Sequence, residues 1–500
     1  MPIGLIFATT EKGLFGVGKG LPWKCPTDME FFKKMTLKRN VVMGSSTMLG
    51  LPSPLKDRTN LVITSKFGHL KDGFEVFSFT DLFFESKDKG DPYWVIGGKS
   101  ILNQMLDFHY NHIDVIAHNI IPDECVKDGI NLSSPDGIYF DLSKLEVFAL
   151  FPDVTKETIN LGNGVISHIY TRKSKFRSLP KLDQDYLSHG MKILQEEPRD
   201  GRNGLTRSSF DPDIMIKASF GRRDSSELPG LSKSGIDTQS FPILQTKRVW
   251  FKGVKEELDF FLSGKTDTRV LESQGVNIWR GNTNREFLDS TGKSHYEAGD
   301  MGPMYGFQWR HFGETYKGFD QIYAGLDQIE RVVRLLTNDP NSRRILLTTY
   351  NAEQASEGVL YPCHGLITQF YVKPSGDGRP DSISLKTYQR SADWFLGVPF
   401  NISSYALLLQ YIVDRVNLTG GTVGTVPEAG GPVSTTPYLP GDVITYFGDA
   451  HIYEAHVTAF LEQYIYAHLL PPDDGIRPYV KDGVLYDYKP RISIKADMVA

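Results

Sequence analysis

A cysteine directly followed by a histidine, at Cys363 and His364, could carry out nucleophilic chemistry. A free cysteine is most often a buried structural residue, and this pair alone does not favour catalysis over that alternative. The stretch 388–405 changes the balance, because it combines an arginine–serine pair with an aspartate, a glycine and an asparagine. These residue types recognise anions and amides, and a nearby arginine should lower the pKa of the cysteine toward the attacking thiolate form. The sequence therefore predicts a cysteine nucleophile beside an anion-binding site.

Two further features of the same half could support this nucleophile. Arg343 and Arg344 add adjacent positive charges, but neighbouring side chains on a strand point to opposite faces. Both arginines would serve one site only through a kink or a second subunit. Glu257 shares a helical face with apolar residues, where burial would raise its pKa toward the range useful for proton transfer. The alternative role, a solvated helical glutamate, fits Glu256 better.

A carboxylate on an apolar helix face marks the first half of the chain. Asp28 shares that face with Phe31, Phe32 and Met35, and Pro26 suits a helix entry. A carboxylate in such a place is costly unless it has a partner. Two interpretations stay open: an N-terminal cap or first-turn acid, or a carboxylate held for a polar heterocycle.

A pair of glycines between a predicted strand and a predicted helix, Gly97-Gly98, is a second feature of this half. Such an arrangement can bring phosphate groups close to the N–H groups at a helix N-terminus. Paired glycines also serve any tight turn, so the pair alone is compatible with either role.

The elements that must position these residues form two domains. Residues 1–173 alternate short apolar strands with amphipathic helices, which predicts an α/β domain with a central sheet. The expected strands are residues 5–8, 41–43, 61–63, 93–96 and 115–117, with a closing strand at 168–172. A short polar junction, 174–181, leads to the second domain.

The second domain, 182–500, begins with a helical pattern around 186–194. A strong helix is expected at 405–416. It precedes a segment rich in glycine, proline, threonine and valine, which predicts an inserted surface loop at 419–440. Residues 374–380 have the pattern of a smaller insertion.

Bulk properties limit the possible functional classes. The length of 500 residues exceeds one ordinary core, in agreement with two domains. The net charge of −5 and the lack of an RNA-recognition motif or basic stripe argue against nucleic-acid binding. The three cysteines are far apart without a CxxC pair, which predicts neither disulfides nor a metal site and favours a reducing compartment, the cytoplasm. No run of about 18 apolar residues predicts a membrane span, and the apolar start predicts a buried strand.

The second half resembles thymidylate synthase from about residue 183 to the end of the chain. The matching stretches, in family order, are 241–250, 302–313, 360–364, 388–405 and 448–453. The resemblance implies an α+β fold and a homodimer. It also implies reductive methylation of dUMP to dTMP, with 5,10-methylene-tetrahydrofolate as co-substrate.

The resemblance assigns roles to individual residues of this half. Cys363 is expected to attack C6 of dUMP, and Asn401 to read the uracil amide edge. Glu257 is expected to pass protons through water, and Tyr305 to assist removal of the C5 proton. The residues expected to bind dUMP are Arg202, Arg343, Arg344, Arg390, Ser391, His364, Asn401, His451 and Tyr453, with the adjacent arginines reaching into the partner subunit. Those expected to contact the folate are Ile278, Trp279, Asp393, Gly397, Phe400 and Ala500.

The first half resembles dihydrofolate reductase over essentially its whole length. The matching residues are 16–23, Asp28 with Phe32, 42–44 with Thr47, 55–58 and 96–98. The resemblance implies a central, mostly parallel sheet and the NADPH-dependent reduction of dihydrofolate to tetrahydrofolate. The whole chain is thereby expected to be a bifunctional enzyme of the folate and pyrimidine pathways.

In this half, the resemblance implies that Asp28 binds the pterin amidine edge and supports protonation of N5. Phe32, Leu51 and Leu55 are expected to line the apolar pocket, and Arg58 to pair with the folate glutamate carboxylate. NADPH is expected to lie across Gly97-Gly98. The remaining residues expected to bind the cofactor are Ala8 near the nicotinamide, Thr47 near the pyrophosphate, Gly16, Ser65 and Lys66, of which Lys66 offers a charge for the 2′-phosphate.

Departures from the family patterns keep alternatives open. In the reductase half they are Lys19 for a usual Asn, Ser45-Ser46 for a basic residue, Leu102 for a Tyr, and Ala117 for a Thr that braces the acid. One alternative is therefore an active synthase joined to a degenerate, non-catalytic reductase half. In the synthase half the departures are Tyr361, Arg280 and Ala455. A dCMP hydroxymethylase is a second alternative, and Asn401 argues against it because that chemistry prefers an acid there.

Overall fold

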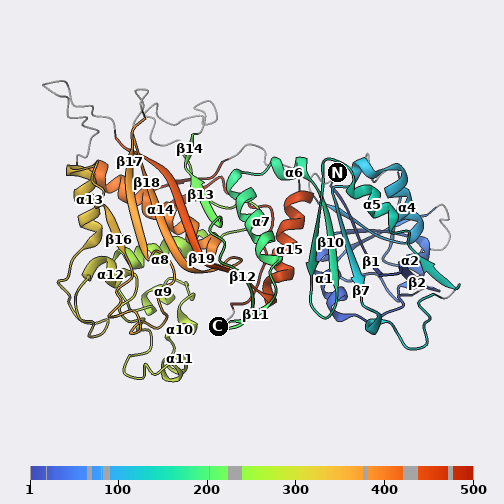
Figure 1. The fold of residues 1–500 in the computed structure, drawn as a ribbon, viewed down its shortest axis with the longest axis horizontal. Helices are drawn as coiled ribbons and strands as arrows, with labels where there is room; N and C mark the ends of the chain where they lie inside the picture. The colour runs from blue at the N-terminus through green and yellow to red at the C-terminus, as the bar shows by residue number, and fades with distance from the viewer. Residues whose placement is uncertain are drawn as a thin grey trace. The chain divides into compact units, whose positions relative to one another are not determined.

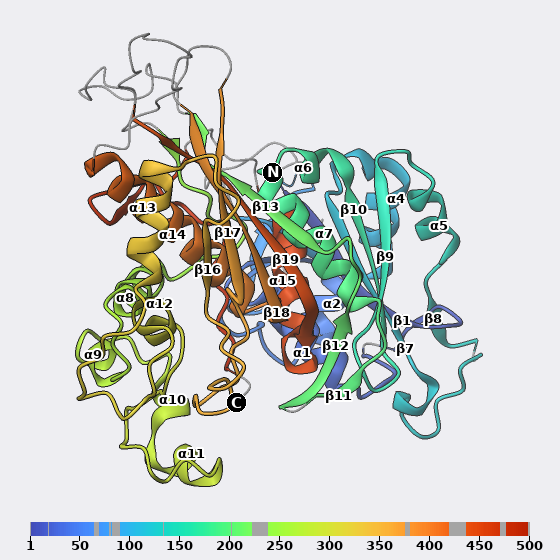
Figure 2. The same cartoon turned by 60° about the vertical axis from the view of Figure 1, so that its left-hand side comes forward.

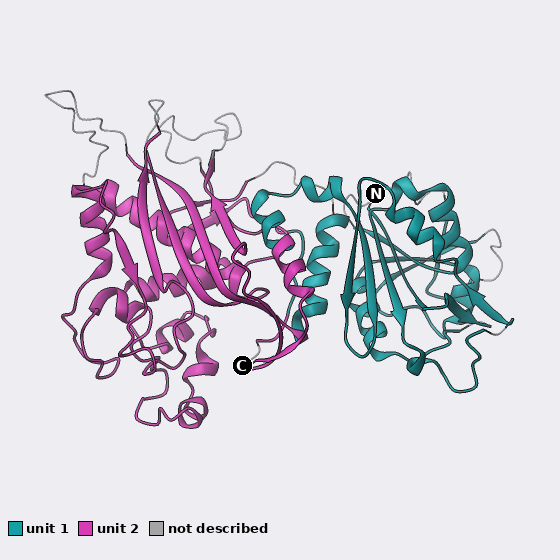
Figure 3. Ribbon diagram, viewed as in Figure 1, with its two compact units in different colours: residues 1–187, 455–474, 491–495 teal, residues 188–454, 475–490, 496–500 magenta. Residues whose placement is uncertain are grey.

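The computed structural model describes residues 2–18, 20–64, 70–79, 82, 91–133, 135–201, 203–222, 239–375, 381–419, 437–470 and 477–498. Contacts divide the chain into two compact units, which Figure 3 colours separately. Unit 1 comprises residues 1–187, 455–474 and 491–495, and unit 2 comprises residues 188–454, 475–490 and 496–500. A segment from near the end of the chain therefore belongs to the unit formed by its beginning.

Unit 1 is built on a sheet, of which Figure 1 labels β1, β7 and β10. Its strand order is β5-β4-β3-β6-β1-β7-β10-β9. Its strands are β1 (Ile3–Thr10), β3 (Asn40–Gly44), β4 (Thr59–Ile63), β5 (Glu75–Phe77), β6 (Tyr93–Gly97), β7 (Val115–Ile121), β9 (Val154–Asn160) and β10 (Ile166–Arg172). The strands from β5 to β7 in this order run parallel, and β10 is antiparallel to both of its neighbours. All of β1 is buried, as expected for a parallel strand that is covered on both faces. The predicted mostly parallel sheet is confirmed.

The last strand of this sheet in the sequence, β10, is not its edge. It lies between β7 and β9, so β9 closes the sheet on that side. The sequence pattern did not predict β9, because most of its residues are polar and only Val154 and Ile159 are buried.

The remaining elements of unit 1 cover this sheet or extend from it. They are β2 (Leu14–Val17), α1 (Pro26–Thr36), α2 (Ser45–Gly50), α4 (Lys99–Phe108), β8 (Gly137–Tyr139), α5 (Ser143–Ala149), α6 (Lys173–Arg177) and the first half of α7 (Lys181–Leu194). Helix α1 starts at Pro26, whose fixed φ suits the first helical position, and Asp28 in the first turn complements the helix dipole. The junction predicted at 174–181 is mostly helical, since α6 covers its first residues and α7 begins at Lys181.

Helix α15 (Glu454–Leu469) completes the core of unit 1. The hydroxyl of Tyr466 donates a hydrogen bond to the carbonyl of Met35 in α1 and accepts one of 3.1 Å from the Trp94 indole. Trp94 is fully buried, and the guanidinium of Arg39 lies 4.7 Å from the Tyr466 ring centre. A tyrosine from the end of the chain thereby fixes the last turn of α1.

Unit 2 is built on a mixed sheet with the order β11-β12-β19-β18-β17-β16, with β13 also paired to β19. Its strands are β11 (Arg199–Gly201), β12 (Gly204–Ser209), β13 (Met215–Ser219), β16 (Leu346–Thr348), β17 (Ile367–Lys373), β18 (Ser382–Asp393) and β19 (Leu439–Tyr453). Strands β18 and β19 run parallel and the other pairs antiparallel. This arrangement with its separate helices confirms the expected α+β fold.

Helix α14 (Gly397–Leu418) lies against one face of this sheet (Figures 1 and 2). It is longer at both ends than the predicted helix 405–416, and it is apolar on most sides because it is packed between the sheet and α8 (Phe251–Leu262). The other elements of unit 2 are α9 (Arg269–Ser273), α10 (Arg280–Thr283), α11 (Arg285–Ser290), α12 (Gly306–His311), α13 (Gln328–Asn338) and the two-stranded pairs β14 (Gly221–Arg222) with β15 (Gln239–Ser240) and β20 (Tyr479–Lys481) with β21 (Val484–Tyr486).

The predicted insertions fall largely outside the described residues. Of the loop expected at 419–440, residues 420–436 lie outside them, and Leu439 and Pro440 already belong to β19. Of the segment 374–380, residues 376–380 lie outside them. Among the described residues, no helix is both long and apolar enough to cross a bilayer.

Candidate active sites

Cys363 lies between β16 and β17, where the hydroxyl of Tyr305 approaches its Sγ to 3.4 Å. Burial raises the pKa of the Cys363 thiol, while the Tyr305 hydrogen bond and the charge of Arg390 lower it in part. The expectation that a nearby arginine lowers this pKa is confirmed in direction for Arg390, but desolvation outweighs the arginine and the pKa lies above its ordinary value.

Arg390 of β18 holds the segment that precedes the cysteine. Its Nε donates to the carbonyl of Pro362 at 2.7 Å and its Nη2 to that of Tyr361 at 3.1 Å. The guanidinium also lies 5.0 Å from the centre of the Tyr361 ring, and the backbone N–H of Arg390 bonds to the Cys363 carbonyl at 2.9 Å. The departure at Tyr361 thus provides a surface for the arginine to stack on. One residue both positions the cysteine and brings positive charge to it.

Glu257 of α8 is buried, and burial raises its pKa to about 7. The Trp279 indole donates a hydrogen bond of 2.7 Å to its Oε1, which lowers the pKa in part. Glu256 next to it is more exposed, as predicted. A carboxyl group with this pKa can accept and release protons near neutrality.

Tyr305 has a strained backbone, with φ at 32° and ψ at −89° directly before α12. Such a conformation persists where the surroundings enforce it, and it is common at functional sites. The next residue has no room for a side chain, because a Cβ on Gly306 would lie 2.6 Å from the Phe261 carbonyl oxygen. The Tyr305 ring stacks on His364 at 4.4 Å, and burial lowers the pKa of His364 to about 4, which keeps that imidazole neutral.

Polar side chains from β18, β19 and α14 are held by their own partners in unit 2. Asn401 donates from Nδ2 to Gln389 Oε1 at 3.2 Å, so the Asn401 carbonyl oxygen has its orientation fixed. One carboxylate oxygen of Asp393 accepts the backbone N–H groups of Phe395 and Leu396 at 3.0 Å each. His451 bonds through Nδ1 to Asp449 at 2.9 Å.

In unit 1, Asp28 is buried in the first turn of α1. Its Oδ1 accepts a hydrogen bond of 2.9 Å from the Asn119 amide of β7. Burial raises the pKa of Asp28, and the bond from Asn119 lowers it in part. Asp28 lies in the first turn of α1 but its side chain does not cap the helix start, so of the first interpretation the first-turn acid is confirmed and the cap is not.

Gly97 and Gly98 lie where β6 meets α4. Gly97 has a φ of 126°, which residues with a side chain rarely adopt. A Cβ on Gly98 would lie 3.2 Å from Thr47 Oγ1 in α2, a tight contact that requires Thr47 to move slightly. Gly98 directly precedes α4, at whose N-terminus backbone N–H groups favour phosphate.

Comparisons with known proteins cover both units. A family model described as dihydrofolate reductase matches residues 2–126, and one described as thymidylate synthase matches residues 228–427. The bifunctional dihydrofolate reductase-thymidylate synthase 1 of Arabidopsis thaliana is 34% identical over 92% of this chain and 87% of its own length. Bifunctional proteins of the same name from Zea mays and Leishmania major are 31% and 30% identical, over 90% and 97% of this chain and 86% and 92% of their lengths.

This chain belongs to the bifunctional dihydrofolate reductase–thymidylate synthase family. It is an enzyme with an NADPH-dependent reductase half and a synthase half that uses methylene-tetrahydrofolate. Nothing in the comparisons favours a degenerate reductase half. The turn at Gly98, beside Thr47 and at the N-terminus of α4, suits the phosphates of a dinucleotide, because a side chain at position 98 would crowd Thr47.

Several residues that steady the sites of this bifunctional enzyme escaped the sequence analysis. In the reductase, Ala117 was expected to stand where the family has a Thr that braces the acid, and another residue of the same strand bonds to that acid. Ala117 pairs with Ile6 and Ile169, and Asn119 two residues further on, on the same face of β7, braces the acid. Pairing of β7 with β1 decides which residue faces the acid, and spacing along the chain does not predict that register.

The reductase residues expected around the folate have partners that were also missed. Arg58 donates from Nε to Thr36 Oγ1 at 2.9 Å, and its guanidinium lies 6.0 Å from the Phe32 ring centre. Asn60 bonds to both backbone polar groups of Leu55, at 2.9 and 3.0 Å. Leu51 accepts a bond of 2.7 Å from Lys71 at its carbonyl. Leu102, which departs from the family pattern, is fully buried in the core.

In the synthase, Lys247 lies within the matching stretch 241–250 but is not among the predicted site residues. It is buried, its Nζ donates to the carbonyl of Phe395, and burial lowers its pKa to about 7. Arg199 of β11 is another missed residue, and its Nη2 lies 2.6 Å from Asp449. Both residues steady segments with predicted ligand contacts, Asp393–Gly397 through Lys247 and His451 through Asp449.

The remaining predicted site residues fall into two groups, those within the described part of the chain and those outside it. Arg343 and Arg344 are exposed just before β16, and Ser391, Gly397, Phe400, Ile278 and Tyr453 are partly buried in unit 2. Ala8 lies on β1 opposite Asn119, and Gly16 lies on β2. Arg202, Ser65, Lys66, Lys19 and Ala500 lie outside the described residues.

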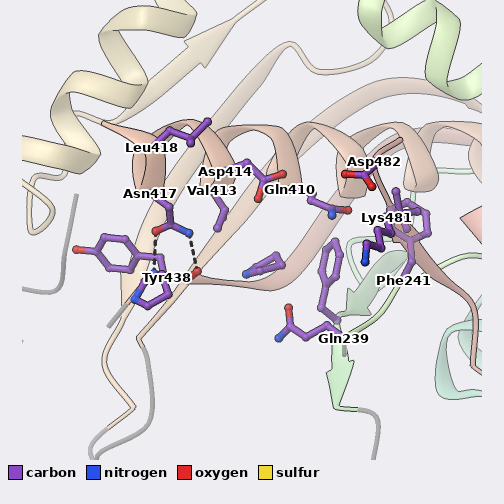
Figure 4. A pocket seen from close by; sticks show the side chains of 14 residues that line it. Gln239, Phe241, Gln410, Val413, Asp414, Asn417, Leu418, Tyr438, Lys481 and Asp482 are labelled. Carbon is purple, nitrogen blue, oxygen red and sulfur yellow. Dashed lines mark hydrogen bonds between the residues drawn. The ribbon is translucent and has the colours of Figure 1, made fainter. Parts of the chain in front are cut away.

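A cavity of about 510 Å³ in unit 2 is separate from these residues (Figure 4). It lies at the C-terminal end of α14, where Asn417 bonds through both ends of its amide to the backbone of Tyr438, at 3.0 and 2.9 Å. Asn401 and Asn417 are sixteen residues apart on α14, which corresponds to about 24 Å. None of the predicted site residues lines this cavity.

Proposed function

We propose that Cys363 is the nucleophile of the synthase and that Asp28 is the acidic residue of the reductase. The observation that supports the first assignment is the cluster of Cys363 with Tyr305 and Arg390, with the buried carboxyl of Glu257 near enough to influence the thiol. For the second it is the buried carboxyl of Asp28, whose Oδ1 accepts a hydrogen bond from the Asn119 amide.

In the synthase reaction, Cys363 forms a bond from Sγ to C6 of dUMP, which makes C5 nucleophilic toward the methylene group. Arg390, Ser391 and Arg202 bind the phosphate, and its arrival completes an ion pair with Arg390. Tyr305 assists loss of the C5 proton. Glu257, with a pKa near neutrality, receives and returns protons at the pyrimidine carbonyl.

Residues around the nucleophile set the choice of substrate. Asn401, oriented by Gln389, presents its amide to the uracil N3–H and O4 edge. His451 and Tyr453 hold the deoxyribose hydroxyl, and His364 contacts the nucleotide as a neutral imidazole. Ile278, Trp279, Asp393, Gly397, Phe400 and Ala500 contact the folate. Turnover of dUMP well above that of dCMP is expected, and faster turnover of dCMP would contradict the role of Asn401.

In the reductase reaction, NADPH supplies the hydride. Asp28 binds the amidine edge of the pterin and supports protonation of N5, and Phe32, Leu51 and Leu55 enclose the ring. Arg58, steadied by Thr36, pairs with the glutamate carboxylate. Ala8, Gly16, Thr47, Ser65, Lys66, Gly97 and Gly98 hold the cofactor.

One face of the unit 2 sheet carries exposed apolar side chains, which supports the proposal of a homodimer. Strand β17 alternates buried and exposed residues, and large apolar side chains lie on its exposed face, among them Tyr371, which is 65% exposed. Leu346 of β16, Ile367 of β17 and Tyr446 of β19 are exposed on neighbouring strands. An apolar patch of this kind is characteristic of a subunit interface. Arg343 and Arg344, exposed beside it, would reach the phosphate bound by the partner.

A complementation experiment tests the dimer and the shared site together. Cys363→Ser and the double variant Arg343→Ala/Arg344→Ala are each expected to be inactive as synthases. After denaturation and refolding as an equal mixture, a hybrid dimer regains one intact site, so about a quarter of the activity should return. No recovery from a mixture that contains dimers would contradict the contribution of the arginines across the interface.

A covalent trap and a spectroscopic assay test the two reaction sites. Incubation with 5-fluoro-dUMP and methylene-tetrahydrofolate should add the mass of both ligands to the wild-type chain and not to Cys363→Ser. Dihydrofolate absorbance should rise with dUMP and methylene-tetrahydrofolate, and fall again on addition of NADPH. In Asp28→Asn it should rise as before but fall far more slowly. An unmodified wild-type mass, or an unaffected fall in Asp28→Asn, would contradict the respective assignment.

A further inference from the structure

The amide of Asn119 is buried beside Asp28 with only one of its two polar ends in use. The side chain is 2% exposed, and its Nδ2 donates to Asp28 Oδ1 at 2.9 Å. Its Oδ1 has no hydrogen-bond partner among the described residues. A buried carbonyl oxygen without a donor is unfavourable, so this atom is suited to a ligand that supplies an N–H group.

The backbone fixes where that oxygen lies. Asn119 pairs with Ala8 on β1 and with Ser167 on β10, so it sits on a central strand that cannot shift easily. The amide must turn its N–H toward Asp28 whenever the carboxylate is ionised, because an ionised carboxylate only accepts hydrogen bonds. The Nδ2 atom then bonds to the carboxylate, and the Oδ1 atom of the same amide is left to accept a hydrogen bond from another group.

The chemistry of an amidine edge matches this pair of acceptors. A carboxylate such as Asp28 takes one N–H from the ring nitrogen and one from the exocyclic amino group. That amino group retains a second N–H, and a neutral carbonyl oxygen is a suitable acceptor for it. We propose that Asn119 is a specificity-determining residue of the reductase: Nδ2 steadies the Asp28 carboxylate while Oδ1 accepts the second N–H of the pterin 2-amino group. This inference rests on the assignment of Asp28 to the pterin.

Two ligands that differ only in the amino group test the proposal. The probes are a 2,4-diaminopteridine and its 2-methyl-4-amino analogue, titrated into the full-length chain. The wild type prefers the 2-amino compound, partly through Asp28. In Asn119→Leu the ratio of the two affinities should fall by about two- to tenfold, the effect of one hydrogen bond. An unchanged ratio would overturn the proposal.

A matched control and a conservative variant complete this design. Ser167→Ala removes a buried hydroxyl, also without a partner among the described residues, directly opposite Asn119 on β10, and it should leave the affinity ratio unchanged. Asn119→Thr replaces the amide by a hydroxyl that can both donate and accept, and it should restore part of the ratio. Synthase activity of each variant reports that the chain has folded. A fall in the ratio in Ser167→Ala as large as in Asn119→Leu would show a packing effect and contradict the proposal.

The pH dependence of dihydrofolate reduction provides a readout that a purely structural role would not move. The bond from Asn119 lowers the pKa of Asp28, so Asn119→Leu should move the apparent pKa of the rate profile upward. A loss of packing alone would reduce the rate equally at every pH, and that result would contradict the proposal. If Asp28→Asn kept full activity, the assignment of Asp28 would fail. An inactive Asp28→Asn with an unchanged ratio in Asn119→Leu would reject only the inference about Asn119.

Discussion

The indole N–H of Trp279 donates a hydrogen bond of 2.7 Å to Oε1 of Glu257. The two residues are far enough apart in sequence that only the packing of α8 against the segment before α10 brings them together. Trp279 was expected to contact the folate, and in the structure its indole also bonds to Glu257. It restrains the carboxyl group whose pKa burial raises to about 7.

Replacing Trp279 should therefore change the pH dependence of the synthase. Trp279→Phe removes a hydrogen bond that lowers the pKa of Glu257, so that pKa should rise above about 7. The limb of the rate profile that belongs to Glu257 should shift to higher pH, measured as kcat over pH 5 to 10. Trp250→Phe, which changes an indole exposed at the start of α8, is the control. A Trp279→Phe profile that coincides with that of the wild type would contradict the coupling.

Glu257 should also make stability depend on pH. Its folded pKa of about 7 lies above the ordinary value of 4.5, so its favourable contribution is complete below pH 4.5 and lost as pH rises through 7. Glu257→Gln mimics the neutral form and should be more stable than the wild type at pH 8, by at most about 3 kcal/mol. At pH 4.5 the two should unfold alike. Thermal unfolding at both pH values measures this, and equal stabilities at pH 8 would contradict a raised pKa.

Arg390→Lys should weaken the synthase although it keeps the charge. Lysine cannot bond to the Pro362 and Tyr361 carbonyls with a planar fork, nor stack on the Tyr361 ring in the same way. We expect the KM for dUMP to rise by about tenfold or more, the cost of roughly one charged hydrogen bond. Alkylation of Cys363 by iodoacetamide should no longer follow a single rate, because the segment that precedes the cysteine loses these hydrogen bonds. Lys192→Arg, at an exposed position of α7, should change neither measurement.

Tyr466→Phe tests whether α15 is part of the reductase fold. The change removes the hydrogen bonds to the Met35 carbonyl and from the Trp94 indole, and it leaves both groups buried without this partner. Unit 1 should lose about 1–3 kcal/mol of its free energy of unfolding. Denaturant unfolding followed by reductase activity measures the loss. Tyr486→Phe, at an exposed tyrosine, should have no effect, and an equal effect of both changes would contradict the role of Tyr466.

Much of the two sites could be predicted from the sequence because the residues involved are neighbours along the chain. Cys363 with His364, Asp28 with Phe32, and Gly97 with Gly98 each lie within one turn, strand end or helix start, so local spacing is enough to identify them. The buried Glu257 followed from helical periodicity in the same way. The main strands of unit 1 and the helix α14 were predicted from their apolar runs, which long-range contacts do not alter.

The sequence by itself determined the two enzyme families, the order of their motifs and the residue types that carry out the chemistry. Only the tertiary structure decided which distant groups support them: Asn119 beside Asp28, Trp279 beside Glu257, and Tyr466 against α1. It also decided that burial outweighs Arg390 in setting the pKa of Cys363. The physical reason is that strand register, helix packing and desolvation depend on residues brought together by folding. The spacing of residues along the chain does not predict them.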